Sequence, residues 1–520
     1  MATMPDASTP PPAAPPTGPQ PAAGPEPATP LTPPPRPIRF VHRGAVQTVS
    51  GLPSTLSVLA WLREHARCTG TKEGCNEGDC GACTVLVGEL DAEGRAVDFK
   101  PVNSCIQFLP TLDGKALVTV EDLGGRHPAQ QAMVACHGSQ CGFCTPGFVM
   151  SLAASYQRQP DGSVPSRQQL ADDLSGNLCR CTGYRPILDA GQRMFEGPRQ
   201  PIDTAPLRPL LQALRADPPL HHAAATPFHA PRSLADLAAL RLARPQARLL
   251  AGGTDVGLWV NKQFRDLGEV IYLGEVAALK AITADGGLLR IGAGASLEAA
   301  WAALAAHWPA LREMYLRFAS RPVREAGTMG GNLANGSPIG DSAPVLMALG
   351  AALMLRRGEA QRSLPLDAFY LGYQRNALAE GEFVEAITLP LPGADDRTRV
   401  RAYKLSKRYD CDISAVAAGL ALRLADDGTV ATARFAYGGL AATVKRAAAT
   451  EAALIGQPWT EPALRAAQAA LAQDFQPLSD LRASAAYRLR GARALLERFW
   501  LATRLHDPLP EDRLNVREAA

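Results

Sequence analysis

The chain has 520 residues, enough for several domains, and its 53 basic and 50 acidic residues leave a formal net charge of only +3 at pH 7. Because acidic and basic residues are interspersed, the composition does not indicate nucleic acid or an anionic membrane as a partner. The longest apolar run, residues 344–355, is too short for the roughly 20 residues that span a bilayer, so we expect a soluble, cytoplasmic protein.

Residues 1–36 consist mostly of proline, alanine and threonine and show no apolar periodicity. Such a segment cannot bury enough surface to offset the entropy lost on ordering, which predicts a disordered, partly polyproline extension. A role as a Pro-rich ligand for a partner domain stays open.

A compact group of cysteines follows a predicted strand at 38–43 and a predicted helix at 54–64, and a second strand is predicted at 84–87. Three of these cysteines have the C-x4-C-x2-C spacing of plant ferredoxins, and a fourth lies further along the chain. This spacing predicts a [2Fe-2S] site made by Cys75, Cys80, Cys83 and Cys105.

Glycines within this loop support the same prediction. Gly74, Gly78 and Gly81 permit the sharp bend that turns backbone N–H groups toward the sulfurs. Cys68 lies outside the ligand spacing and is expected to be a packed free thiol.

A second group of cysteines lies in a region without strand alternation, where helices are predicted at 128–135, 145–157, 167–174 and 187–195. Its two close pairs predict another [2Fe-2S] site made by Cys141, Cys144, Cys179 and Cys181. Pro146 suits the first turn of the helix after Cys144, and a helix N-terminus favours nearby thiolates.

Three alternatives to these cluster sites stay open. Cys136 or His137 could replace one ligand of the second group, since histidine ligates iron in Rieske centres. Structural zinc also takes four cysteines, although a loop that supplies three thiolates is unlike a zinc knuckle. Disulfides require an oxidising compartment, and no signal peptide is apparent.

Two glycine-rich loops follow a segment rich in Pro, Ala and Leu that we interpret as a linker. The first, residues 251–255, lies between a predicted strand at 248–250 and a predicted helix at 256–260; the second begins at Gly327. Such loops present backbone N–H groups to a diphosphate.

Residues 288–297 imitate a Rossmann turn but have Leu297 at the third glycine position, so we predict a strand followed by a helix that Ser296 caps.

The C-terminal region is predicted to alternate strands and helices, with strands at 400–405, 420–424 and 432–437 and helices at 461–474 and 481–504. A charged loop, residues 406–412, lies between the first two strands. From charge alone this loop would be an ordinary solvated turn.

The cysteine motifs permit a comparison with a known family. Residues 138–148 (GSQCGFCTPGF) and 179–186 (CRCTGYRP) resemble the second iron-sulfur domain of the molybdenum hydroxylases. With the ferredoxin-like loop before them and the glycine loops after them, the chain resembles the small, iron-sulfur/FAD subunit of the bacterial xanthine dehydrogenases over about residues 37–505.

This resemblance implies a multidomain α+β fold. It implies a β-grasp ferredoxin-like 2Fe-2S domain at 37–120, an all-α four-helix 2Fe-2S domain at 121–205, an α+β FAD-binding domain of the PCMH/VAO type at 226–395 and a small C-terminal α+β domain at 396–505. The extension at 1–36, a linker at 206–225 and a tail at 506–520 complete the predicted organisation.

The resemblance also implies the residues that bind FAD. The first diphosphate loop corresponds to Leu249, Leu250, Ala251, Gly252, Gly253, Thr254, Asp255 and Val256, and the second to Thr328, Met329, Gly330, Gly331 and Asn332. Further positions correspond to an aromatic residue by the flavin, an acid near the ribose and two contacts on the flavin side: Phe318, Asp341, Val384 and Lys404. The loop 406–412 matches a segment near the flavin and NAD.

The implied function is electron transfer. In the family, a purine is hydroxylated at molybdopterin on a large subunit, and electrons pass through two [2Fe-2S] clusters to FAD and on to NAD. The implied assembly is a heterotetramer of two small and two large subunits, and no acid-base residue is assigned to this chain. An aldehyde or other N-heterocycle hydroxylase is an alternative, as is a non-enzymatic scaffold stapled by zinc.

Overall fold

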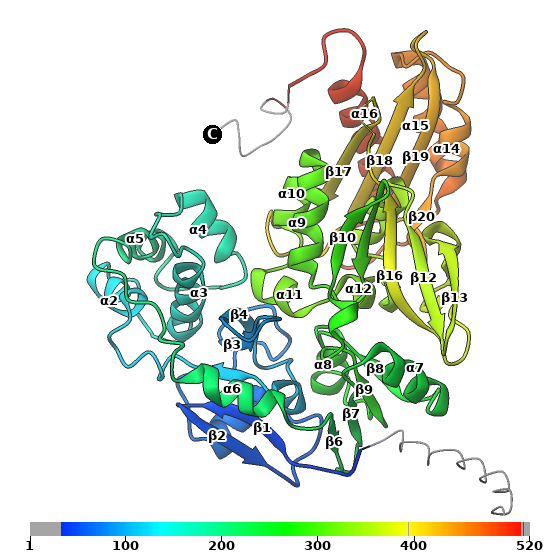
Figure 1. Cartoon of the computed structure of the whole chain (residues 1–520). Coiled ribbons are helices and arrows are strands. Elements are labelled where there is room, and N and C mark those ends of the chain that lie inside the picture. Colours follow the sequence, from blue (N-terminus) through cyan, green and yellow to red (C-terminus); the bar gives the residue numbers. More distant parts are fainter. Residues whose placement is uncertain (1–32, 394, 511–512, 514–520) are drawn as a thin grey trace, which may run out of the picture. The chain divides into compact units, whose positions relative to one another are not determined.

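The structure is a computed structural model that describes residues 33–393, 395–510 and 513 (Figure 1). The predicted extension lies outside the described residues except for residues 33–36, and so does the predicted tail except for residues 506–510 and 513. The described part is a mixed α/β chain with several separate sheets, as expected for a multidomain protein. No helix within it has the length and apolar character needed to cross a membrane.

The N-terminal sheet has the strand order β2-β1-β5-β3-β4 and mixes parallel with antiparallel pairs. Its elements are β1 (Ile38–His42), β2 (Ala45–Val49), α1 (Val58–Ala60), η1 (Trp61–His65), β3 (Thr84–Leu90), β4 (Val97–Asn103), η2 (Leu109–Leu112) and β5 (Ala116–Val118). The predicted helix at 54–64 begins only at Val58, because Ser57 is its N-cap and accepts the N–H of Ala60 at 3.1 Å.

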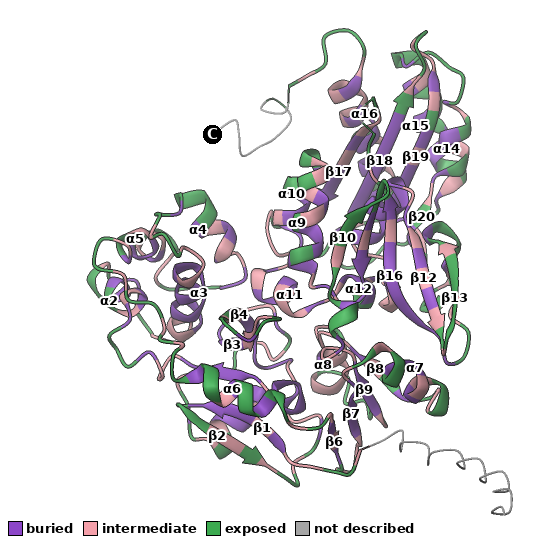
Figure 2. Cartoon of the chain, in the orientation of Figure 1, coloured by how far each residue is buried: buried purple, intermediate pink, exposed green. Residues whose placement is uncertain are grey.

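Four helices follow and form the helical cluster, seen together in Figure 1. They are α2 (Pro128–Ala135), α3 (Thr145–Gln157), α4 (Arg167–Asp173) and α5 (Arg185–Arg193), close to the predicted bounds. Ser166 starts α4 with a capping box that Gln169 completes. The middle of α3 is fully buried (Figure 2), and it shares one hydrophobic core with Leu86 and Phe99 of the N-terminal sheet.

A buried histidine at the start of α2 makes the stability of this region dependent on pH. His127 is the N-cap of α2, and its Nδ1 accepts the N–H of Ala129 at 3.1 Å, which requires that nitrogen to be unprotonated. Burial, followed by the positive charge of Arg199, lowers the pKa of His127 to about 4. The unfolded chain, with an ordinary pKa of about 6.5, therefore binds a proton in a range where the folded chain does not.

We expect the contribution of His127 to the free energy of unfolding to be fully present above pH 6.5. It should fall by about 3 kcal/mol as the pH drops to about 4. His127→Asn keeps a good N-cap without a titrating group, so this part of the decline should disappear. The measurement is the thermal unfolding midpoint of both proteins between pH 7.5 and 4.5. Parallel curves over this range would contradict the assignment.

The segment 206–225, interpreted as a linker, contains regular secondary structure. This segment contains α6 (Leu207–Arg215), whose Leu211 and Leu214 pack in the core shared with the N-terminal sheet, and β6 (Leu220–His222). The leucines follow helical spacing, which the surrounding prolines and alanines obscured. His222 in β6 is only 2% exposed.

The next part of the chain has two sheets. The small sheet, β6-β7-β9-β8, adds β7 (Phe228–Ala230), β8 (Arg248–Leu250) and β9 (Val270–Tyr272), with α7 (Leu234–Ala243) and α8 (Val256–Asn261). The central sheet, β10-β11-β16-β12-β13, comprises β10 (Ile282–Asp285), β11 (Leu288–Gly292), β12 (Ala352–Arg357), β13 (Ala360–Pro365) and β16 (Phe383–Pro390).

Helices and short segments accompany the central sheet, and most of them pack around one large core. They are η3 (Ala277–Leu279), α9 (Leu297–His307), η4 (Pro309–Leu311), α10 (Arg312–Arg317), α11 (Arg321–Ala326), α12 (Met329–Asn335), α13 (Ser342–Ala348), η5 (Leu366–Ala368), β14 (Tyr370–Gly372) and β15 (Arg375–Asn376). Ser296 caps α9, as predicted, and β11 pairs antiparallel with both neighbours. A Rossmann unit requires parallel strands, so the rejection of that site is confirmed.

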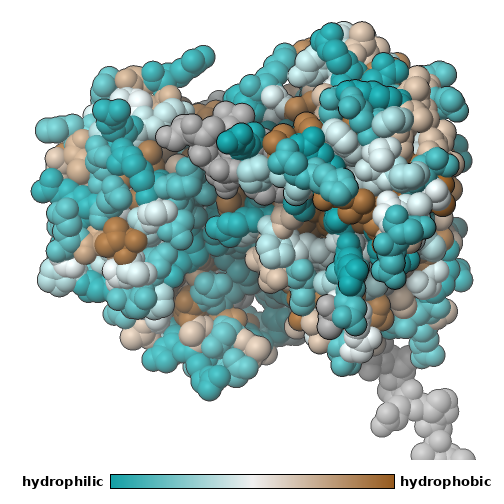
Figure 3. All heavy atoms as spheres, turned by 90° about the horizontal axis from the view of Figure 1, so that it is seen from above, coloured by the Kyte–Doolittle hydropathy of each residue, from teal (hydrophilic) through white to brown (hydrophobic). Residues whose placement is uncertain are grey.

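The C-terminal sheet, β17-β18-β19-β20, is covered by helices that bury its strands (Figure 2). Its elements are β17 (Arg399–Leu405), β18 (Val416–Leu424), β19 (Val430–Gly438), β20 (Lys445–Arg446), α14 (Ala448–Ala452), α15 (Glu461–Asp474) and α16 (Ala485–Thr503). The predicted bounds of α15 are confirmed. The molecular face in Figure 3 is mostly hydrophilic, with small apolar areas between.

Candidate functional site

The structure brings the first group of cysteines together. The Sγ atoms of Cys83 and Cys105 are 3.3 Å apart, and both residues are almost fully buried. Hydrogen bonds from the thiols of Cys105 and Cys80 lower the pKa of Cys75 far below the ordinary range of a thiol. The four side chains thus form one connected set, and a thiolate, the form that binds metal, is stabilised within it.

The backbone of this loop fits an iron-sulfur cluster. Gly78 and Gly81 have φ values of +79° and +70°, in the left-handed region that glycine adopts without strain. At Gly74, a Cβ would come within 2.8 Å of the Cys80 sulfur, so only glycine leaves room there. The backbone N–H of Cys80 points at Cys75 Sγ, 3.4 Å away, as the expected inward N–H groups should.

The second group of cysteines lies at the surface of the helical cluster. The Sγ atoms of Cys181 and Cys141 are 3.4 Å apart, and both residues are exposed. Hydrogen bonds from the backbone and the thiol of Cys141 lower the pKa of Cys181 to about 7. Cys144 is the N-cap of α3, and burial followed by the thiol of Cys179 raises its pKa to about 12.

The alternative ligand Cys136 ends α2, where it packs against the hydrophobic core of the helical cluster. His137 follows it with a φ of +53°. The sulfur contacts of the second group instead join the four predicted cysteines, which favours the set without Cys136 or His137.

Within residues 33–393, 395–510 and 513, no group of three or more His, Cys, Asp or Glu side chains is arranged to hold a single metal ion. A two-iron cluster makes a different demand, because its four thiolates are shared between two irons and need not converge on one point.

The two cysteine groups are direct neighbours. The N–H of Leu178 donates to the carbonyl of Cys80 at 3.1 Å, and Leu178 immediately precedes Cys179. Asn177 Nδ2 donates to the carbonyl of Gly81 at 3.1 Å. A single backbone hydrogen bond thus connects a residue of one group with the residue beside the other.

The two glycine loops face a common cavity of about 280 Å³ between the small sheet and the central sheet. The predicted residues that line it are Leu249, Ala251, Gly252, Gly253, Thr254, Asp255, Val256, Thr328, Gly330, Gly331, Asn332 and Val384. The two loops touch closely, since a Cβ on Gly252 would come within 1.9 Å of the Ala326 carbonyl oxygen. A cavity walled by two glycine loops, with backbone and small side chains at its surface, suits the diphosphate of a dinucleotide.

Five predicted positions do not line this cavity. Leu250 and Met329 are fully buried in the strand and helix beside it. Phe318 packs in the core of the central sheet, with its ring 6.0 Å from that of Trp301. Asp341 and Lys404 bond to each other, with Lys404 Nζ 2.7 Å from Asp341 Oδ2.

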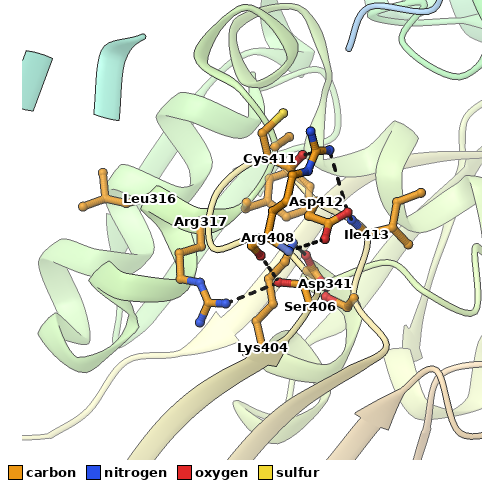
Figure 4. Close-up of polar contacts among 12 residues, drawn as sticks. Leu316, Arg317, Asp341, Lys404, Ser406, Arg408, Cys411, Asp412 and Ile413 are labelled. Atoms are coloured by element: carbon orange, nitrogen blue, oxygen red, sulfur yellow. Dashed lines mark hydrogen bonds and ion pairs between the residues drawn. The ribbon is translucent and has the colours of Figure 1, made fainter. Parts of the chain in front are cut away.

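The loop 406–412 is a defined structure rather than a solvated turn (Figure 4). The Asp412 carboxylate accepts the N–H of Arg408 at 2.7 Å, and the Arg317 guanidinium stacks on the Tyr409 ring at 4.3 Å. Arg408 Nη2 also approaches Asp79 of the first cysteine loop at 3.9 Å. The loop therefore lies between the predicted flavin contact Lys404 and the first cysteine group.

Other residues at the cavity were not predicted from the sequence. They are Arg241, Ala247, Arg248, Trp259, Leu273, Ala293, Leu297, Ala334, Asn335, Asn376, Leu378 and Phe383. Arg241 and Arg248 add positive charge, which suits a diphosphate, but Arg241 lies in a helix whose sequence has no phosphate-binding motif. Only the fold of the chain around the cavity reveals these residues.

Comparison with family models gives matches along much of the chain. A model described as the FAD binding domain in molybdopterin dehydrogenase matches residues 223–392. A CO dehydrogenase flavoprotein C-terminal domain matches residues 401–503, and a [2Fe-2S] binding domain matches residues 119–192.

The chain is 31% identical over 500 residues to a xanthine dehydrogenase of Emericella nidulans, covering 84% of this chain and 36% of that protein. It is 30% identical to aldehyde oxidase 4 of Cavia porcellus, and the match covers 79% of this chain and 35% of that protein. The chain spans about a third of the length of these curated relatives. Among solved structures, a reconstituted CO dehydrogenase from Oligotropha carboxidovorans is 31% identical, covering 52% of this chain and 94% of that chain with a TM-score of 0.49.

Proposed function

Because the chain belongs to the molybdenum hydroxylase family, with a 2Fe-2S-binding and an FAD-binding domain, we propose that it is the electron-transfer subunit of a xanthine dehydrogenase. In this role it receives electrons from purine hydroxylation at a molybdopterin site on a large partner subunit. It passes them through two [2Fe-2S] clusters and FAD to NAD. The proposed assembly is a heterotetramer of two small and two large subunits in the cytoplasm.

One observation carries this proposal: the two cysteine groups and the dinucleotide cavity are consecutive neighbours. Leu178 joins the second group to the first through the Cys80 carbonyl at 3.1 Å. Gln107, two residues after Cys105, donates its Nε2 N–H to the carbonyl of Gly252 in the first glycine loop at 3.0 Å. This order of contacts is what stepwise electron transfer from one cofactor to the next requires.

The protein contributes binding, orientation and electrostatic tuning to this role. The clusters supply one-electron transfer, and FAD supplies the conversion of two single electrons into one hydride for NAD. Cys75, Cys80, Cys83 and Cys105 would hold the first cluster at a partly buried site, and Cys141, Cys144, Cys179 and Cys181 would hold the second nearer the surface. The glycine loops hold the diphosphate with backbone N–H groups. The proposed electron and hydride transfer requires no acid-base residue of this chain.

An aldehyde hydroxylase with the same electron path is a second candidate. The chain is 30% identical to an aldehyde oxidase, close to its 31% identity with a xanthine dehydrogenase. The substrate binds at the molybdenum site in this family, so the partner subunit decides between the two.

The proposal is tested by the visible spectrum and the iron, zinc and flavin content of the chain purified without air, then by assays with its partner subunit. We expect four irons and one FAD per chain and reduction of NAD by xanthine. Reduction by aldehydes instead of xanthine would select the second candidate. A colourless chain with zinc and no flavin would overturn both and favour the zinc-stapled scaffold.

A further inference from the structure

We propose that Asn261 is a positioning residue that fixes the first cysteine group relative to the FAD-binding loop and thereby sets the reduction potential of the cluster held there. This inference rests on the proposed function, since it concerns the cluster and flavin sites assigned above. Asn261 is the last residue of α8 and belongs to neither cysteine motif nor glycine loop.

The side chain of Asn261 reaches both segments of the first cysteine group. Its Nδ2 lies 2.8 Å from the carbonyl oxygen of Cys105, a proposed ligand. The same nitrogen lies 3.2 Å from Oδ1 and 3.4 Å from the carbonyl oxygen of Asn76, which follows the ligand Cys75. Two of these neighbours are carbonyl oxygens, which only accept hydrogen bonds, so the amide nitrogen must face them.

Asn76, which Asn261 contacts, has an unusual backbone conformation. Asn76 has a φ of +55°, a left-handed conformation that is uncommon outside glycine, although asparagine adopts it more readily than most residues, and that contacts with its surroundings support. The amide of Asn261 supplies that support at both the backbone and the side chain of Asn76. Loss of this donor would therefore affect the conformation of the loop beside Cys75.

Helix α8 is a short, rigid connection between this contact and the dinucleotide cavity. Its N-cap, Asp255, belongs to the first glycine loop. At Gly257, a Cβ would come within 2.8 Å of both Cβ and the carbonyl oxygen of Ile106, so the helix backbone lies directly against the residue after Cys105. Leu258 packs against Cys83, Cys105 and Ile106. The helix thus fixes the separation of the two cofactor sites, and Asn261 attaches the C-terminal end of the helix to the first cysteine group.

The contact with Cys105 also has an electrostatic consequence. Reduction adds negative charge to an iron-sulfur cluster, and hydrogen-bond donors near its ligands stabilise that charge. The amide dipole of Asn261 points its positive end at Cys105 and Asn76. Removing the donor should therefore favour the oxidised cluster and lower its potential.

The test uses the holoprotein with both clusters and FAD bound and compares Asn261→Leu, Asn261→Asp and Asn261→Gln. Potentials of the two clusters are measured by reductive titration followed by electron paramagnetic resonance, and FAD content by absorbance. For Asn261→Leu we expect the reduction potential of the first cluster to fall by about 59 mV. For a one-electron couple this corresponds to about a tenfold lower ratio of reduced to oxidised cluster at a fixed potential. Asn261→Asp adds a negative charge and should shift it at least as far, whereas Asn261→Gln keeps a donor and should shift it less.

The potential of the second cluster and the FAD content should be unchanged in all three variants, which separates positioning from general damage. Gln212→Leu is the matched control, because Gln212 also donates an amide N–H to a backbone carbonyl of the N-terminal sheet region, that of Gly94 at 2.9 Å, and neither residue belongs to a cysteine motif. An unshifted first cluster in Asn261→Asp, or an equal shift in the Gln212 control, would overturn the inference. Wild-type protein without iron or flavin would instead overturn the proposed function.

Discussion

Replacing Cys80 with serine is expected to halve the iron content of the chain, leave FAD bound and reduce electron flow from the partner subunit to NAD to background. Cys80 belongs to the connected thiol set through its contact with Cys75, and a Cβ at Gly74 would come within 2.8 Å of its sulfur. A serine hydroxyl is a harder, more weakly acidic ligand than a thiol and would not replace it on iron. The glycine loops lie on separate sheets, so flavin binding should survive.

The measurements are iron and FAD per chain, the cluster signals in electron paramagnetic resonance, and NAD reduction after assembly with the partner. Cys68→Ser is the matched control, because Cys68 is a buried cysteine of the same region whose sulfur contacts His42 instead of the thiol set, at 3.5 Å. That control should keep its full iron content. Wild-type NAD reduction by xanthine in the Cys80 variant would be incompatible with the proposed electron path.

Replacing Lys404 with methionine should destabilise the protein by about 3–5 kcal/mol, the usual result of removing one partner of a buried ion pair. The side chains of Lys404 and Asp341 are only 2% and 6% exposed, and their charged atoms are 2.7 Å apart. Ser414 donates a further hydrogen bond to the Asp341 carboxylate at 2.6 Å, but a hydroxyl does not supply the lost positive charge. The variant would therefore leave an uncompensated carboxylate in the interior.

The urea midpoint of the unfolding transition and the release of flavin with rising urea would measure this effect. Lys407→Met provides the control, since Lys407 is a nearby exposed lysine that donates to the Leu481 carbonyl and should change stability by less than about 0.5 kcal/mol. Adding Asp341→Asn to Lys404→Met removes the unpaired charge and should recover part of the loss. Equal midpoints for Lys404→Met and Lys407→Met would show that the buried pair is not stabilising.

Predictions that depend on neighbouring residues in the sequence were the most accurate. Helices α2 and α3 begin at prolines that suit a first turn, and α4 and α9 begin at serine caps, so their starts follow from a few adjacent residues. The helix within segment 206–225 was not predicted, because proline and alanine weaken the periodic pattern. The leucines of α6 gain their helical structure by packing against the N-terminal sheet.

The sequence by itself determined the kind of chemistry available to this protein, because cysteine spacing and glycine-rich loops are local patterns with few physical uses. It also determined most helix starts, since caps act within one turn. Only the tertiary structure decided which of these parts are neighbours: Leu178 beside Cys80, Asn261 beside Cys105, and Asp341 paired with Lys404 in the interior. These contacts join residues 63 to 156 positions apart, and nothing in either partner's local sequence identifies the other. They form because the separate sheets and helices pack their apolar faces together, and that packing brings distant polar groups within hydrogen-bonding distance.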